Sequence, residues 1–289
     1  MPTVQKQVSR PAPNKNGSVL DRIRPVGEVT QKAITLNVYG RSKTGKTRLA
    51  CTFPKPLLLI GSEDGTASVR NVKGVDFIRV YKAAEIDQLF DMVRKTSKYK
   101  TVCIDHAGGL QDMILKEILG LDELPIQRTF GMAKRDDWMA CSAQTKERLN
   151  AHLHLAETHS INAVVIAHER DFSKKGDEAE STASDLERSL PQIGAYVQPA
   201  VKDWLDGACD YICQTFIRDK VIYEKSVMDD GSEMLIPITS KDKEYCLRVG
   251  PSSVFTTGFR LVDGINLPDA IVNPSYEKIR DLALGKSVK

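Results

Sequence analysis

The sequence predicts an α/β fold, with a mostly parallel sheet flanked by helices and antiparallel strands that extend it near the carboxyl terminus. Two observations lead to this prediction. Apolar, strand-like runs alternate with helical stretches from residue 33 to about residue 208, as in parallel strands joined by crossover helices. From about residue 209 to residue 265, short strand-like runs follow one another with turn signals between them, which indicates antiparallel pairing.

The composition is that of a folded protein. The chain has 289 residues, 41% of them hydrophobic and 27% charged, which fits one large domain or one domain with appendages. Its formal net charge of +3 offers no global polycation, so any nucleic-acid site has to be local. No apolar run approaches the ~20 residues of a membrane helix, and no signal peptide is visible, so we expect a cytoplasmic protein with no membrane partner.

The elements are expected in the following order. Residues 1–32 are rich in proline and basic residues and are predicted to be a flexible basic arm, either a simple tail or a segment that docks on a neighbouring subunit or on phosphates. Residues 33–289 form the domain. Its expected strands are 34–39, 56–60, 76–80, 101–105 and 161–167, with helices at 46–52, 84–96, 108–119, 136–159 and 196–205. Residues 169–190 are predicted to be a mobile loop. The later strands are expected at 210–217, 221–226, 234–238, 244–249 and 255–261.

The six cysteines lie in mostly apolar surroundings without a C-x-x-C pair. They are predicted to be reduced thiols in the core rather than a disulfide framework or a zinc site.

The strongest motif lies between the first expected strand and the first expected helix. It has the form G-x-x-x-x-G-K-[ST] and consists of Gly40, Arg41, Ser42, Lys43, Thr44, Gly45, Lys46 and Thr47. Such a loop curls its backbone N–H groups around phosphates, the lysine reaches the β- and γ-phosphates, and the hydroxyl of the last residue binds Mg²⁺. The sequence therefore predicts a site for ATP and Mg²⁺.

Polar side chains end three further strands. Asp105 closes an apolar strand, where it is predicted to hold the magnesium ion. Glu63 follows the strand after the phosphate loop and is predicted to act as the general base on the attacking water. His168 ends a buried strand and is predicted to respond to the γ-phosphate. A capping or turn role for these side chains is the alternative interpretation.

These four elements, in this order, resemble the phage-type P-loop ATPases of the RecA-like class, including the short single-strand annealing ATPases of bacteriophages. The resemblance runs from Ile34 to about Asp210, with further similarity as far as Ile271. It implies a RecA-like core, ATP hydrolysis, self-association as a ring or filament, and the cytoplasm of the host cell. It also favours Glu63 over Asp64 as the base, because the catalytic glutamate of the class lies at the tip of this strand.

The resemblance further implies a single-stranded DNA channel, with a single-strand-binding protein as a second candidate partner. Its phosphate contacts would be Lys134, Arg135, Arg170, Lys174 and Lys175. A basic residue from the neighbouring subunit would complete the ATP site, for which Arg260 is the first candidate and Lys241 and Lys243 are rivals. Two features depart from the class: His106 stands where Ser or Thr is usual, and acidic residues in segment 169–190 argue against tight DNA binding there.

The preferred interpretation is an oligomeric, magnesium-dependent ATPase that acts on single-stranded DNA in recombination or annealing. One alternative is a non-catalytic module in which ATP controls binding to a replication or packaging protein. Another is a small-molecule or nucleotide kinase, because a phosphate loop alone does not identify the phosphate acceptor.

Overall fold

The structure is a computed structural model that describes residues 33–121, 133–172, 191–227, 233–261 and 265–288. All of these belong to one compact unit, Ala33–Lys289. The arm predicted for residues 1–32 lies outside the described residues.

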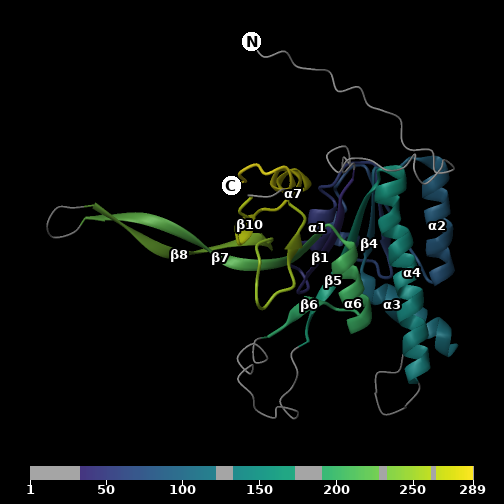
Figure 1. Cartoon of the computed structure of the whole chain (residues 1–289). Coiled ribbons are helices and arrows are strands. Elements are labelled where there is room, and N and C mark those ends of the chain that lie inside the picture. Colours follow the sequence, from purple (N-terminus) through teal and green to yellow (C-terminus); the bar gives the residue numbers. More distant parts are fainter. Residues whose placement is uncertain (1–32, 122–132, 173–190, 228–232, 262–264, 289) are drawn as a thin grey trace, which may run out of the picture. The chain divides into compact units, whose positions relative to one another are not determined.

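A mostly parallel sheet forms the centre of the domain (Figure 1). Its strand order is β10-β8-β7-β1-β5-β4-β2-β3, in which β7 is Tyr211–Val227, β8 is Glu233–Arg248 and β10 is Ala270–Val272. The strands β1 (Thr35–Gly40), β2 (Leu57–Gly61), β3 (Val75–Arg79), β4 (Thr101–Asp105) and the first part of β5 (Asn162–Asp171) run parallel. Because β1, β5, β4 and β2 are parallel neighbours in this order, their carboxyl ends lie at one edge of the sheet. The residues that end β5, β4 and β2 therefore lie beside the loop that follows β1.

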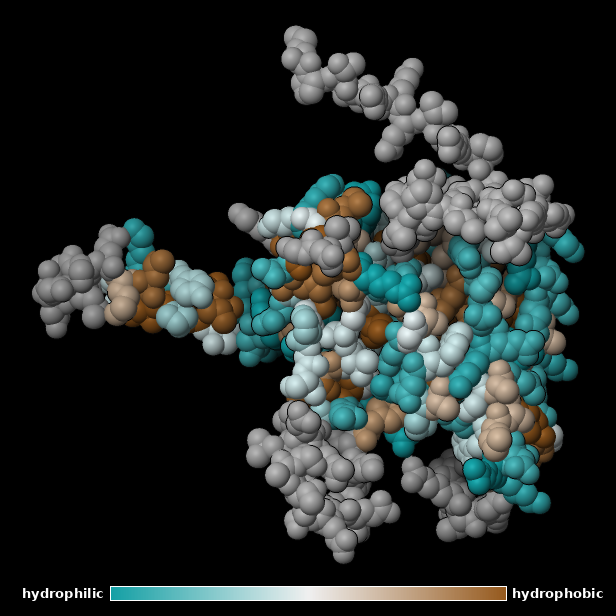
Figure 2. All heavy atoms as spheres, in the orientation of Figure 1, coloured by the Kyte–Doolittle hydropathy of each residue, from teal (hydrophilic) through white to brown (hydrophobic). Residues whose placement is uncertain are grey.

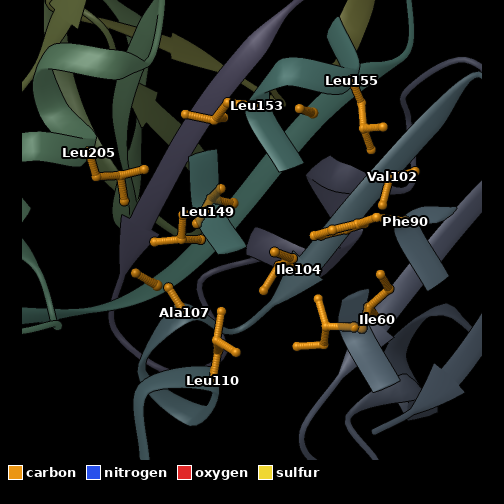
Figure 3. Packing of buried hydrophobic residues seen from close by; sticks show 14 of the residues in the cluster. Ile60, Phe90, Val102, Ile104, Ala107, Leu110, Leu149, Leu153, Leu155 and Leu205 are labelled. Carbon is orange, nitrogen blue, oxygen red and sulfur yellow. The ribbon is translucent and has the colours of Figure 1, made fainter. Parts of the chain in front are cut away.

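Helices cover both faces of this sheet. Alternate residues of a strand point to opposite faces, so the two core clusters identify which helices pack where. Val102 and Ile104 of β4 pack in a cluster with α2 (Ala83–Thr96), α3 (Ala107–Leu119), α4 (Arg135–His159) and α6 (Pro199–Ala208); Figure 3 shows part of this cluster. Cys103 packs on the other face, where α1 (Lys46–Ala50) and α7 (Tyr276–Ala283) contribute buried residues.

The predicted fold class is confirmed, with local corrections. The predicted loop 169–190 is wrong at its start, because β5 continues to Asp171 and its last three residues pair antiparallel with β6 (Ile193–Ala195). Residues 173–190 lie outside the described part of the chain. The helix expected at 196–205 instead spans Pro199–Ala208, since proline is favoured in the first helical turn, where its missing N–H has no intrahelical partner.

The carboxyl-terminal strands also differ from the prediction. In place of the four strands expected between residues 210 and 249, the structure has two long strands, β7 (Tyr211–Val227) and β8 (Glu233–Arg248). β7 runs parallel to β1, not antiparallel as expected. Antiparallel pairing begins with β8, with the short β9 (Gly258–Phe259), and with β10 (Ala270–Val272), which lies beyond the predicted limit at residue 265.

All six cysteines are buried and free, as predicted for core thiols. Burial raises the pKa of the thiols, for example those of Cys209 and Cys213, which keeps them protonated and unreactive.

Across the described ranges, no helix combines the length and the apolar character that crossing a bilayer requires.

Candidate active site

The phosphate loop joins β1 to α1, as predicted. Lys43 and Gly45 both have positive φ, 66° and 91°, so the chain turns sharply just before α1 begins at Lys46. Gly40, at the end of β1, lies against β7, where an added Cβ atom would come within 2.4 Å of the carbonyl oxygen of Thr215. A side chain at position 40 would therefore force the loop away from β7.

Lys46 is held by the backbone of its own loop. Its Nζ donates hydrogen bonds to the carbonyl oxygens of Gly40, at 2.8 Å, and Arg41, at 2.6 Å. Burial lowers the pKa of Lys46, while the carboxylates of Asp105 and Glu169 act in the opposite direction. The ammonium group is thus partly desolvated and aimed along the loop, which strengthens its attraction for a phosphate.

Thr47 and Asp105 meet although their strands are not neighbours. The hydroxyl of Thr47 donates a hydrogen bond of 2.7 Å to Oδ2 of Asp105, because α1 carries Thr47 across the end of β5 toward the end of β4. A hydroxyl and a carboxylate are hard oxygen ligands of the kind that Mg²⁺ accepts beside substrate phosphates. The two predicted metal ligands are therefore brought together, and they fit the ion.

A cleft of about 520 Å³ opens beside the phosphate loop. Its volume lies within the range of small-molecule sites. Lys46, Thr47, Asp105, Glu63 and His168 all line it, so the sequence-predicted residues of three strand ends and one loop share a single space. Glu63 is exposed, which leaves its carboxylate open to water, as a general base requires. The short helix η3 (Thr66–Val69) closes the cleft beyond Glu63.

His168 lies at the point where β5 leaves the parallel sheet. Its half-buried ring meets that of His106 edge-on, with 4.6 Å between ring centroids. Burial lowers the pKa of His168, and His106 and Lys46 lower it further, so the imidazole is neutral at pH 7. His106, which caps α3, has Nδ1 accepting from the backbone N–H of Gly109 at 3.0 Å. A neutral His168 can donate one hydrogen bond toward the cleft.

Four further residues shape the site, and local sequence motifs do not reveal them. Thr215 of β7 has its hydroxyl 2.7 Å from that of Thr44. Glu169 of β5 forms an ion pair of 2.9 Å with Arg41. Phe77 of β3 and Tyr245 of β8 line the cleft. Each of the four lies on a strand whose place beside the loop or the cleft depends on the order of the strands in the sheet.

The predicted DNA contacts are partly described. Lys134 and Arg135 are exposed at the amino end of α4. Arg170 is also exposed, with its guanidinium over the rings of Phe172, at 5.5 Å, and Tyr196, at 5.4 Å. Lys174 and Lys175 lie outside the described residues.

The candidate residues for completing a neighbour's site lie apart from the cleft of their own chain. Arg260 forms an ion pair of 2.8 Å with Asp210, next to the amino end of β7. The phosphate loop adjoins the opposite ends of the parallel strands. Lys241 is exposed, and Lys243 pairs with Asp219 on the neighbouring strand. A role of any of them at a second subunit stays a prediction.

A family model described as an AAA domain covers residues 32–260, which includes the phosphate loop, the ends of β2, β4 and β5, and the carboxyl-terminal strands β7, β8 and β9. A comparison with curated proteins gives no match.

Proposed function

Because the chain belongs to the AAA-domain family of P-loop ATPases, we propose that it hydrolyses magnesium–ATP in this cleft. We propose further that, as a RecA-like, self-associated assembly, it uses that cycle to control its hold on single-stranded DNA in phage-type recombination or annealing. The single observation that carries the ATPase part is the 2.7 Å contact between Thr47 and Asp105, in a cleft that also contains Glu63 and His168.

Each residue has a chemical task in this proposal. The backbone N–H groups of the phosphate loop and Nζ of Lys46 hold the phosphates. Thr47 and Asp105 hold Mg²⁺, which neutralises charge on the β- and γ-phosphates. Glu63 accepts a proton from the attacking water, and neutral His168 donates a hydrogen bond toward the terminal phosphate. Loss of that phosphate removes the acceptor of this hydrogen bond.

The surroundings of His168 support a link to DNA. Its carbonyl oxygen accepts a hydrogen bond of 2.7 Å from the backbone N–H of Tyr196, and Tyr196 carries Arg170 over its ring. Exposed aromatic rings beside arginine are the groups on which single-stranded bases stack. A change at His168 therefore reaches the candidate DNA contacts through one backbone hydrogen bond.

Magnesium-dependent ATP hydrolysis by the wild type, Lys46→Ala and Glu63→Gln, with and without single-stranded DNA at two salt concentrations, tests the proposal. We expect Lys46→Ala to lose ATP binding. We expect Glu63→Gln to bind ATP but to turn over at least a hundredfold more slowly, the size of a general-base contribution. DNA should stimulate the wild type, and less so at higher salt, because phosphate contacts weaken with salt.

The neighbouring carboxylate gives a matched control. Asp64 is exposed, accepts a hydrogen bond from Thr66 and does not line the cleft, so Asp64→Asn should keep wild-type turnover. Equal loss in Asp64→Asn and Glu63→Gln would contradict the assignment of the base. Hydrolysis indifferent to DNA would exclude the DNA role and favour a protein-partnered ATPase, and transfer of phosphate to a small acceptor would indicate a kinase.

A further inference from the structure

Strands β7 and β8 extend beyond the core as a two-stranded ribbon. β1 pairs with β7 only as far as Thr215, and β10 pairs with β8 only over Cys246–Arg248. Residues 221–227 and 233–239, which we call the outer ribbon, pair only with each other among the described strands. Figure 1 shows the ribbon leaving the domain on the side of β10 and α7, away from α2 and α4.

The outer ribbon is apolar on both faces. Tyr223 and Pro237 lie opposite each other and share one face, and Ile222 and Ile238 share the other. Tyr223 is 66% exposed and Leu235 is 59% exposed, and Figure 2 shows hydrophobic residues along the ribbon. Further large apolar side chains exposed on it are Val221, Met234 and Ile236. A lone two-stranded hairpin is marginally stable in water, and an exposed apolar surface of this kind marks an interaction site.

The charge of the outer ribbon favours a protein as its partner. Its charged residues are Lys225, Glu224 and Glu233, so one positive charge stands against two negative ones. Nucleic acids and anionic lipid surfaces attract clusters of Lys and Arg, which this segment lacks. A partner surface that is apolar and carries positive charge fits it better.

The other end of the same sheet offers such a surface. Among the described strands β3 pairs only with β2, which leaves its outer edge open. Phe77, Ile78 and Tyr81 are large apolar residues exposed there. Segment 70–82 has four basic residues, Arg70, Lys73, Arg79 and Lys82, against the single acidic residue Asp76, which is already paired with Lys98 at 2.7 Å.

We propose that the outer ribbon of one copy docks on the β3 edge of a second copy, with strand pairing between the two chains. An open strand edge accepts an added strand through main-chain hydrogen bonds, while the exposed side chains supply contact area. Seven ribbon residues span about 23 Å and the five residues of β3 about 16 Å, at about 3.3 Å per residue, so the strand lengths are compatible.

This contact is heterologous, since it joins different surfaces of the two copies. Such contacts form rings where the rotation closes and filaments where it does not. Phe77 both belongs to the β3 edge and lines the nucleotide cleft, so docking would place the neighbour's ribbon beside the bound nucleotide. The inference rests on the self-association included in the proposed function and assigns surfaces to it.

Sedimentation velocity of the full chain over a range of concentrations, with and without magnesium–ATP, tests the contact. We expect assemblies of the wild type, and at least a tenfold rise in the concentration needed for assembly for Tyr223→Ser/Leu235→Ser. The control is Met139→Ser/Leu284→Ser, which removes two apolar side chains of matched exposure, 60% and 63%, from other surfaces. It should assemble like the wild type. Circular dichroism confirms that each variant is folded.

Cysteine cross-linking then identifies the two surfaces. The six native cysteines are buried, so Leu235→Cys and Ile78→Cys each add one accessible thiol. We expect a cross-link in a mixture of these two variants and none within either variant alone. A monomeric wild type, unchanged assembly of Tyr223→Ser/Leu235→Ser, or cross-links within Leu235→Cys alone would overturn the inference. ATP hydrolysis measured on the same samples distinguishes this failure from failure of the proposed enzyme.

Discussion

Replacing Thr215 by valine removes one hydroxyl from beside the phosphate loop and preserves the shape of the side chain. Three contacts lie where β7 meets the loop. The hydroxyl of Thr44 lies 2.8 Å from the carbonyl oxygen of Arg41 and 2.7 Å from the hydroxyl of Thr215. The hydroxyl of Thr215 also lies 3.3 Å from the carbonyl oxygen of Tyr39. The two hydroxyls have one hydrogen each. At most two of the three contacts are therefore hydrogen bonds at one time.

The expected magnitude follows from this count. In Thr215→Val the hydroxyl of Thr44 keeps its bond to Arg41, so the variant loses one buried hydrogen bond. Such a bond contributes about 0.5–1.5 kcal/mol to the free energy of unfolding. Because the lost bond fixes Thr44 within the loop that surrounds the phosphates, we expect ATP to bind about threefold to tenfold more weakly, which corresponds to about 0.7–1.4 kcal/mol.

Thr101→Val is the matched control. Thr101 is also a fully buried threonine on a parallel strand, and its hydroxyl donates to the carbonyl of Pro54 at 2.7 Å, at the end of the sheet away from the loop. Urea unfolding should show a similar loss of stability in both variants. Calorimetric titration with magnesium–ATP should show weaker binding in Thr215→Val alone. Equal affinities in the two variants would refute the argument that β7 supports the phosphate loop.

Three further substitutions test other parts of the molecule. Gly40→Ala places a methyl group 2.4 Å from the backbone of Thr215, so ATP binding measured by calorimetry should fall at least tenfold; wild-type affinity would contradict the tight packing of the loop on β7. Asp105→Asn should raise the Mg²⁺ concentration needed for half-maximal ATP hydrolysis while leaving magnesium-free nucleotide binding unchanged, and an unaltered requirement would remove Asp105 from the metal site. Burial lowers the pKa of His152 to about 4 from 6.5, so between those values the unfolded chain takes up the proton first and stability falls as the pH falls. Between pH 7.5 and pH 5 the wild type should lose about 2 kcal/mol more than His152→Leu in urea unfolding, and equal losses would show that His152 does not carry this dependence.

The residues that the sequence singles out line one cleft because they end strands or belong to the glycine-containing loop. Parallel strands present their carboxyl ends at one edge of a sheet, so Asp105, Glu63 and His168 converge wherever the strands are correctly assigned. Each of those strands is buried on both faces and therefore appears in the sequence as a short continuous apolar run between helical stretches. These runs identified the strands. The phosphate loop supplied the remaining contacts through a local motif.

Thr215 and Tyr245 could not be predicted in the same way. The sequence around these two residues looks like that of any other strand. They reach the loop only because β7 pairs with β1 and β8 pairs with β7. Finding them requires the order of strands in the sheet, which local patterns do not specify.

The long ribbon was divided into four strands for a related reason. The expected strands leave out residues 218–220 and 239–243, but in the structure Arg218 pairs with Glu244 and Asp219 with Lys243 across the two strands. Opposite charges in such positions stabilise paired strands. Where neither face of a strand is buried, polar and apolar residues are equally tolerated and the usual alternation disappears.

The position of β5 between β1 and β4 separates the residues proposed to bind the phosphates from the residue proposed to respond to the last phosphate. The groups that would grip the phosphates belong to the loop after β1 and to the end of β4, whereas His168 belongs to neither. Under the proposed function, a substitution at position 168 is therefore expected to alter how the protein responds to the last phosphate while the affinity for the rest of the nucleotide stays the same. Position 168 is then, besides Glu63, a place at which the lifetime of the ATP-bound form is expected to change, by mutation or by design, without rebuilding the phosphate loop.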